Sequence, residues 1–454
     1  MSFRHFSTAV LLCLPLPLSA DEFRAPRSLV DAAQAGAGIQ RTMTLLATST
    51  AAHPNPVRIL FYGQSITEQD WWKEVAEDLG KRFPHAALTI ENRAIGGHSS
   101  QLLHRTAEAD LYPFYPDLVI FHVYGAHNHY EDIIRRLRQR TTAEILIQTD
   151  HVAKKDALDE PTDPAAPPSQ WNSFINYNFL PSLKTKYGIG LLPQRDLWKQ
   201  YLRDYQLAPA ALLKDDVHLN ENGCHLMAAI VKSYLIHQPE AQRTGWEKWV
   251  RQLPAPAVQD GTLTLAFEGN RIDAHLTGQP QGTVWIDGQP VSAHSGVHVF
   301  TRTSGYNGTN WPCLLKPGRG PTAPQEETWT LTLRDANADY TAFNFSLSGS
   351  LTGPDGKGSA TEKFVSPSGR ISIDPADWNL NYCYKVFGKR LPDDFKISWK
   401  STVTGCDVLP AKSGAVTLAQ GLANGPHTLM IKGLQAGSVD SLTVYQPTLA
   451  TTDP

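Results

Sequence analysis

The stretch that decides the fold is residues 59–72, ILFYGQSITEQDWW. It opens with apolar residues typical of a buried strand and then breaks at a glycine into a loop that carries a single serine, Ser65. A helical pattern follows, with apolar residues recurring over 70–83. A strand that runs through a short loop into a helix is the repeating unit of a parallel α/β sheet.

Further segments repeat this unit. Apolar runs that read as strands occupy residues 57–63, 87–97, 117–125 and 144–151. Helical spacing occupies residues 70–83, 131–140 and the segment that follows Gly223. Near-continuous apolar strands that alternate with helices indicate a parallel sheet covered by helices on both faces. We therefore expect an α/β domain over residues 21–252.

The pattern changes after residue 252. Apolar residues then alternate with polar ones, as in 263–267, 329–333 and 343–347, and Asp287 with Gly288 forms a hairpin signal. This predicts an antiparallel, jelly-roll-like β-sandwich over residues 253–454. Aromatic residues of this half belong either to its core or to a sugar-stacking platform: Tyr306, Trp311, Trp378 and Trp399.

A proline- and acid-rich segment, residues 156–170, interrupts the α/β pattern. It leaves the end of a strand, which is the edge where open α/β sheets build their sites. It is therefore either a lid or substrate-contacting loop, or a solvated insertion without a role.

The N-terminus predicts export. Arg4 and His5 precede an apolar run over residues 8–18, which has the length of a signal-peptide core and is too short to span a bilayer. We expect a signal peptide over residues 1–20, cleaved after Ala20, and a secreted or periplasmic protein without membrane insertion. The net charge of −3 gives no basic patch that would favour nucleic acid.

Removal of that segment leaves cysteines at positions 224, 313, 383 and 406. A bridge between Cys383 and Cys406 is possible in an oxidising compartment, and free buried thiols are the alternative. The spacing of the cysteines matches no zinc motif.

Two segments suggest nucleophilic catalysis. Ser65 lies in a loop between a strand and a helix, where it is either a nucleophile or the cap of the helix; Thr67 could cap the helix instead. In residues 214–223, KDDVHLNENG, Asp215 and His218 are three apart. In a tight turn such a carboxylate can orient the imidazole while the second ring nitrogen takes a proton from a serine, although Asp216 could be the residue that bonds.

Two more strand ends offer hydrogen-bond donors. In residues 92–100, NRAIGGHSS, the backbone N–H of Gly97 could approach a substrate oxygen. In residues 123–131, VYGAHNHYE, the side chains of His127 and Asn128 follow another strand. Asparagine side chains can donate to an oxyanion.

Together these loops resemble the sequence blocks of the SGNH (GDSL-type) hydrolase family, over roughly residues 55–237. GQSIT is similar to the first block, NRAIGG to the second, YGAHN stands where the third belongs, and DDVHLNENG is similar to the fifth. The resemblance implies a three-layer, flavodoxin-like α/β fold. It also implies a catalytic triad made of Ser65, Asp215 and His218. The implied oxyanion hole consists of Ser65, Gly97 and Asn128.

Two positions depart from the family pattern. Gln64 stands where the family has an acidic residue, which suggests a divergent, carbohydrate-directed branch. In strict register His127, and not Asn128, occupies the position of the third-block asparagine. Either side chain, or the backbone N–H groups of Ser65 and Gly97 alone, would then complete the oxyanion hole.

The implied reaction is two-step acyl transfer without a metal or organic cofactor. His98, His127 and His129 cluster on these loops as candidate metal ligands, although they show no ligand spacing. An exported esterase with an accessory sandwich resembles enzymes that deacetylate polysaccharides, so the expected partner is an acylated carbohydrate. Candidate substrate-binding residues are Trp71, His127 and His151.

Competing interpretations are a lipid or aryl esterase on the same triad and a non-catalytic carbohydrate-binding protein. A glycan-cleaving variant is more distant, because Asp215 and Asp216 are not an obvious catalytic pair.

Overall fold

The computed structural model describes residues 23–240 and 245–449. The predicted signal peptide and its cleavage after Ala20 lie outside the described residues. Among the described residues no helix is long and apolar enough to cross a membrane.

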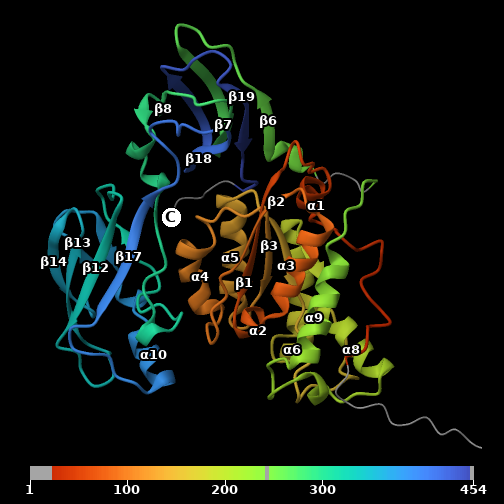
Figure 1. Ribbon diagram of the computed structural model, residues 1–454. Helices are drawn as coiled ribbons and strands as arrows, with labels where there is room; N and C mark the ends of the chain where they lie inside the picture. Colours follow the sequence, from red (N-terminus) through yellow and green to blue (C-terminus); the bar gives the residue numbers. More distant parts are fainter. Residues whose placement is uncertain (1–22, 241–244, 450–454) are drawn as a thin grey trace, which may run out of the picture.

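A parallel sheet forms the centre of the first half (Figure 1). Its order is β2-β1-β3-β4-β5, and every neighbouring pair is parallel. The strands are β1 (Pro56–Gly63), β2 (Ala87–Asn92), β3 (Leu118–His122), β4 (Glu144–Gln148) and β5 (Gly190–Leu192). This is the flavodoxin-like order of a doubly wound fold, so the predicted α/β class is confirmed.

The strands end earlier than the sequence pattern suggests. The ladder stops at Asn92, His122 and Gln148, whereas the apolar runs continue for several residues. Past those points the chain leaves the sheet, and the loops that follow carry the polar residues of the site. Local hydrophobicity does not distinguish a buried strand from a buried loop, which explains the difference.

Alternation along the strands divides their side chains between the two faces. In β1, Ile59 and Phe61 belong to one hydrophobic core, while Leu60 and Tyr62 belong to the other. One face is covered by α3 (Trp71–Arg82), α8 (Gln194–Asp204) and α9 (Glu221–Tyr234). The other is covered by α4 (Ser100–Asp110), α5 (His127–Arg140) and α7 (Leu180–Tyr187). Figure 1 shows α4 and α5 on one side of the sheet and α3, α8 and α9 on the other.

Shorter helical segments complete this half. They are α1 (Gln40–Ala47), α2 (Ser65–Glu68), α6 (Trp171–Ser173), the π-helix η1 (Phe174–Phe179) and the 3-10 helix η2 (Pro209–Leu212).

The second half is antiparallel and divides into two lobes (Figure 1). The lobe at the top of Figure 1 has the strand order β6-β19-β7-β18-β8-β9. Its strands are β6 (Val250–Pro254), β7 (Thr262–Leu276), β8 (Thr283–Ile286), β9 (Gln289–Pro290), β18 (Gly414–Lys432) and β19 (Val439–Tyr445). Asp287 and Gly288, both at positive φ, turn β8 into β9, as the sequence predicts.

The other lobe has the order β10-β17-β12-β13-β14, with a smaller sheet β11-β16-β15 beside it. These strands are β10 (His298–Phe300), β11 (Gly318–Arg319), β12 (Glu327–Arg334), β13 (Asn344–Gly349), β14 (Gly353–Ser359), β15 (Phe364–Val365), β16 (Ile371–Ile373) and β17 (Lys396–Val403). The helical segments of the second half are α10 (Leu380–Phe387) and the 3-10 helices η3 (Trp246–Lys248), η4 (Val291–Ala293), η5 (Ser295–Val297), η6 (Tyr306–Gly308) and η7 (Pro375–Asp377).

The predicted aromatic platform is largely core. Tyr306, Trp311 and Trp399 are buried, and the half-buried Trp378 packs edge-on against Phe343. These residues therefore belong to the core, and the alternative interpretation, a sugar-stacking platform at these positions, was wrong. The cysteines Cys224, Cys313, Cys383 and Cys406 are free thiols, so the structure contains no bridge between Cys383 and Cys406.

The two halves share one hydrophobic core. It runs from the α4 and α5 side of the parallel sheet into the lobe that contains β12 and β17. Charged pairs cross the same boundary: Arg302 meets the buried Asp110 at 2.9 Å, and Arg105 meets Asp377 at 2.6 Å. The boundary is thus packed like a protein interior.

Candidate active site

Ser65 stands directly beyond the end of β1. The strand ends at Gly63, where a Cβ would lie 2.1 Å from the carbonyl oxygen of His122, so the close approach of β3 requires glycine. Ser65 is the first residue of α2, and its N-cap is Gln64. Thr67 lies inside this helix and donates to the carbonyl of His122. Neither residue caps the helix, so the hydroxyl of Ser65 is available for another role.

A chain of hydrogen bonds joins the three predicted triad residues. Ser65 Oγ lies 2.9 Å from His218 Nε2, and His218 Nδ1 lies 2.8 Å from Asp215 Oδ2. The other oxygen of Asp215 accepts from the backbone N–H groups of Val217 at 2.9 Å and His218 at 2.7 Å. These backbone hydrogen bonds, with that from the imidazole, hold the pKa of Asp215 well below its usual range.

Asp216 is not part of this chain. Its carboxylate pairs with Lys154 Nζ at 3.0 Å, on the other side of the turn. The turn itself is closed by a backbone hydrogen bond from Lys214 to His218. Asn220 then caps α9 by accepting from the N–H of Gly223 at 2.9 Å. The motif therefore forms a rigid turn in which Asp215 alone faces the histidine.

Gln69 joins the serine loop to the histidine turn. Its amide donates to the carbonyl of Leu219 at 2.8 Å and accepts from the N–H of the same residue at 3.0 Å. Sequence reasoning missed this residue, although it lies four positions after Ser65. The pocket at this site has a volume of about 400 Å³ and is lined by Ser65, Glu68, Gln69, Lys214, Asp215 and His218.

The second-block loop lies against the serine. A Cβ on Gly96 would stand 3.6 Å from the Cβ of Ser65, so these residues are neighbours. Gly97 has a φ of +73°, a conformation that favours glycine. Among the described residues, the backbone N–H groups of Ser65 and Gly97 donate no hydrogen bond. Both predicted backbone donors are thus free to bind a ligand oxygen.

The third-block residues lie further out. His127 begins α5, and both it and Asn128 are exposed. The His127 ring packs edge-on against Phe174 and Phe179, at 5.7 and 5.6 Å between ring centroids. Neither side chain lines the pocket around Ser65. Their role in an oxyanion hole stays a prediction.

Trp71 and His151 are buried supports of the site. Trp71 donates from its indole to the carbonyl of Ile66 at 2.7 Å and faces the core. Burial lowers the pKa of His151 to about 4, so its imidazole is neutral, and Nε2 donates to the carbonyl of Val217 at 2.7 Å. Trp71 therefore steadies the serine loop, and His151 steadies the triad turn.

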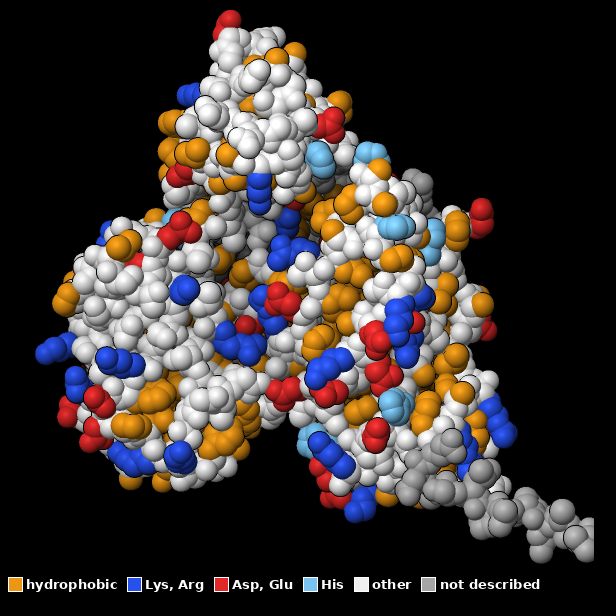
Figure 2. Space-filling view, viewed as in Figure 1, with side chains coloured by type: hydrophobic (Ala, Val, Ile, Leu, Met, Phe, Trp, Pro, Cys, Tyr) orange, Lys and Arg blue, Asp and Glu red, His pale blue; other side chains and the backbone are white. Residues whose placement is uncertain are grey.

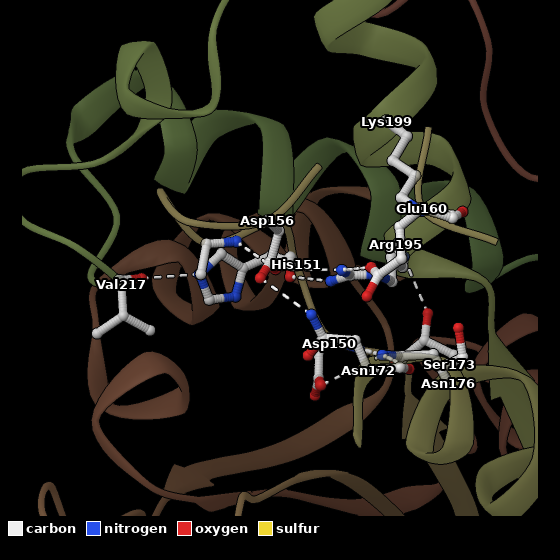
Figure 3. Close-up of polar contacts among 12 residues, drawn as sticks. Asp150, His151, Asp156, Glu160, Asn172, Ser173, Asn176, Arg195, Lys199 and Val217 are labelled. Atoms are coloured by element: carbon white, nitrogen blue, oxygen red, sulfur yellow. Dashed lines mark hydrogen bonds and ion pairs between the residues drawn. The ribbon is translucent and has the colours of Figure 1, made fainter. Parts of the chain in front are cut away.

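Figure 3 shows how His151 lies between Val217 and Arg195. The guanidinium of the buried Arg195 donates to the carbonyl of His151 and pairs with Asp156 at 3.1 Å and Glu160 at 2.7 Å. The proline-rich segment is thus anchored through its acidic residues instead of being freely solvated. A second pocket of about 680 Å³ lies here, and its wall includes Tyr124, His151, Lys155, Trp171 and Val217. Sequence reasoning missed Trp171, which stands just past the predicted loop.

The other two histidines of these loops, His98 and His129, each pack against a ring. His98 packs against Trp311, whereas His129 stacks on His104 at 4.3 Å between centroids. Within the residues that the structure describes, no group of three or more histidine, cysteine or acidic side chains could hold a metal ion.

No protein-family model matches this chain, and no curated protein matches its sequence. Solved structures do match it. One is a GDSL-like lipase from Parabacteroides merdae, with 19% identity, 40% of this chain and 98% of that chain covered, and a TM-score of 0.33. Another is the acetylxylan esterase Axe2 from Geobacillus stearothermophilus, with 16% identity, 42% and 99% covered, and a TM-score of 0.35.

A third match spans both halves. It is a two-domain esterase active on acetylated mannans, with 14% identity, 92% of this chain and 97% of that chain covered, and a TM-score of 0.35. These structures are what the chain is similar to, and the resemblance to SGNH-type, GDSL-like hydrolases rests on the sequence blocks described above. At identities and TM-scores this low, the matches carry no argument about substrate or mechanism. The proposal below rests on the geometry of the site itself.

Proposed function

We propose that this protein is an SGNH-type serine esterase that removes acetyl groups from a polysaccharide or oligosaccharide. The observation that carries the proposal is the unbroken hydrogen-bond chain from Ser65 through His218 to Asp215. A serine in contact with an oriented imidazole is the arrangement required for nucleophilic acyl transfer.

The reaction proceeds in two steps on these residues. Ser65 Oγ attacks the ester carbonyl while His218 Nε2 takes its proton, and Asp215 stabilises the imidazolium that forms. The free N–H groups of Ser65 and Gly97 receive the oxyanion, with Asn128 as a further candidate donor. His218 then protonates the leaving alcohol and activates the water that releases the acid.

The lining of the pocket favours a small acyl group. The residues around Ser65 are all polar, and none offers an apolar channel for a long chain. A lipid esterase would be expected to have such a channel, because burial of each methylene contributes about 0.8 kcal/mol. Acetyl is therefore preferred to a fatty acyl group.

Support for a carbohydrate comes from aromatic side chains close to the site. Trp171 lines the second pocket and is 38% exposed. On the other side, α10 presents the exposed residues Tyr382, Val386 and Phe387. Figure 2 shows hydrophobic side chains gathered on the lower part of the left-hand lobe, beside a notch that separates it from the α/β half. Aromatic faces at a cleft suit the apolar faces of sugar rings.

The test is acetate release from a panel of acetylated polysaccharides, including xylan and mannan, by wild type and by Ser65→Ala. Release by wild type that the variant lacks is the expected result, and the ranking of the panel identifies the glycan. Hydrolysis of long-chain esters only would favour the lipid esterase. Glycan binding by both proteins without any ester hydrolysis would favour the non-catalytic carbohydrate-binding protein.

A further inference from the structure

The loop that carries Gly97 is contacted by the second half of the chain. The hydroxyl of Tyr382, on α10, donates to the carbonyl oxygen of Gly97 at 2.9 Å. The amide of Asn310 donates to Glu68 Oε1 at 2.6 Å, and the other oxygen of Glu68 accepts from the N–H of Gly96 at 3.1 Å. Both peptide groups that flank the Gly96–Gly97 peptide are thereby fixed.

The Gly96–Gly97 peptide itself has a partner. Its carbonyl, on Gly96, lies 3.4 Å from Nδ1 of His98, and Nε2 of His98 faces the amide of Asn379 at 3.4 Å. Burial lowers the pKa of His98 to about 4, which keeps the ring neutral. A neutral ring that donates through Nδ1 and accepts from Asn379 satisfies both contacts. The peptide that bears the Gly97 N–H is therefore linked to the second half.

Trp311 closes the remaining side of Gly97. A Cβ on residue 97 would lie 2.3 Å from Cζ2 of the indole, so the ring occupies the space beside this Cα. The indole stacks on Tyr382, with 5.2 Å between centroids, and meets His98 edge-on at 4.7 Å. The three rings therefore pack together against the loop that carries Gly97.

We infer that Tyr382 is a positioning residue, which together with Asn310 and Trp311 aims the N–H of Gly97 at the oxyanion. The inference rests on the proposed function. A glycine at positive φ on a loop has many accessible conformations, and an oxyanion donor acts only when it is fixed at hydrogen-bond distance before the reaction. The second half supplies this fixation and is thus a part of the active site.

The boundary is rigid enough for this role. Arg302 pairs with Asp110 through both carboxylate oxygens and donates to the carbonyl of Arg93, at the start of the same loop. The shared hydrophobic core lies directly behind these contacts. The residues on α10 therefore hold a set position relative to the serine.

The test compares Tyr382→Phe with Tyr384→Phe in the full chain, using a small aryl acetate as substrate. Tyr384 is on the same helix, and its hydroxyl makes no hydrogen bond within the described residues. Loss of a whole oxyanion donor costs about 100- to 1000-fold in kcat, so a donor that is only loosened should cost roughly tenfold. We expect a roughly tenfold lower kcat in Tyr382→Phe, with unchanged KM, melting temperature and midpoint of the pH–rate profile. Tyr384→Phe should show wild-type kinetics.

The small substrate separates positioning from sugar binding, because it does not extend to the exposed face of α10. A Tyr382→Phe variant that matches Tyr384→Phe on the aryl acetate would overturn the inference. So would a change confined to KM for the polysaccharide, which would make Tyr382 a sugar contact. Asn310→Ala should independently lower kcat in the same direction, and an unchanged kcat there would also count against the inference.

The two proposals fail in different ways. Aryl acetate hydrolysis that persists in Ser65→Ala would refute the serine mechanism and the positioning of Gly97 with it. Hydrolysis that depends on Ser65 but not on Tyr382 would refute the positioning alone.

Discussion

Two adjacent carboxylates have different environments in the turn after η2. Asp215 accepts two backbone N–H groups and the imidazole of His218, whereas Asp216 pairs with Lys154 near the surface. The residue pattern alone left Asp215 and Asp216 as alternatives, because the direction of each side chain depends on how the turn closes, and only the family resemblance selected Asp215. The structure resolves this choice at the level of single residues.

Replacement of these residues by asparagine provides a matched pair. Asp215→Asn should lower kcat by roughly a thousand- to ten-thousandfold, because an amide no longer stabilises the imidazolium. Asp216→Asn should leave kcat nearly unchanged, since it removes only an exposed ion pair. Steady-state kinetics on an aryl acetate measures both, and equal losses in the two variants would contradict the assignment.

Stability should depend on pH through the buried histidines. A histidine in the unfolded chain binds a proton below about pH 6.5, whereas burial lowers the pKa of His98 and of His151 to about 4. Between these values only the unfolded state takes up the proton. The free energy of unfolding is therefore fully retained above about pH 6.5 and falls as the pH falls toward 4, by up to about 1.4 kcal/mol per pH unit for each residue.

Urea unfolding at pH 7 and pH 4.5 measures this dependence. His151→Gln should lose less stability between the two pH values than wild type, because one of the two protonation sites is gone. His53→Gln, at an exposed position, is the control and should behave as wild type. Equal losses in His151→Gln and wild type would show that His151 does not contribute.

At the scale of elements, the segment after β4 is the clearest difference between expectation and structure. Its composition left open whether it is a lid or a solvated insertion. Arg195, on α8, anchors the first residues of the segment by pairing with Asp156 and Glu160, and it also holds His151. No local pattern links residue 195 to this segment, so the anchoring could not be predicted from the sequence.

Arg195→Met should destabilise the protein by about 3–5 kcal/mol, because it leaves the half-buried carboxylates of Asp156 and Glu160 without their cation. Arg334→Met removes an exposed arginine from β12, far from this segment in the sequence, and should cost less than about 0.5 kcal/mol. Denaturant unfolding provides the comparison. A similar loss in both variants would mean that the anchoring contributes little.

The second pocket gives a prediction for substrate binding. Trp171→Ala should raise KM for the polysaccharide by roughly three- to tenfold, the effect of losing about 1 kcal/mol of ring stacking. Kinetics on a small aryl acetate should not change, since that substrate does not need the pocket. If KM rises for both substrates, Trp171 acts on the triad turn and not on the sugar.

At the scale of the whole molecule, the sequence predicted the features that depend on short segments of the chain. The parallel sheet and the hydrogen-bonded set of Ser65, Asp215 and His218 follow from strand ends and one short turn. The lobes do not, because β7 pairs with β18, which lies more than a hundred residues later in the chain. Tyr382 reaches Gly97 across 285 positions, and only tertiary packing makes that contact. The predicted domain bounds at 252 and 253 stay a prediction.

The boundary between the halves should govern both stability and rate. Arg302→Met removes the partner of the buried Asp110 and should lower the free energy of unfolding by about 3–5 kcal/mol. It should also lower kcat, because the Gly97 loop begins at Arg93, which Arg302 holds. Arg334→Met, at an exposed position on β12, is the control. Destabilisation without any fall in kcat would separate the boundary from the site.

The shared core also has a consequence for the order of events during synthesis. The α/β half is made first, and its α4 side is covered by residues that follow position 298. Until those residues emerge, an apolar face stays open and the Gly97 loop lacks Asn310, Trp311 and Tyr382. The nascent chain can therefore complete the triad well before it completes the surroundings of Gly97, so the last third of the chain determines when the site is finished.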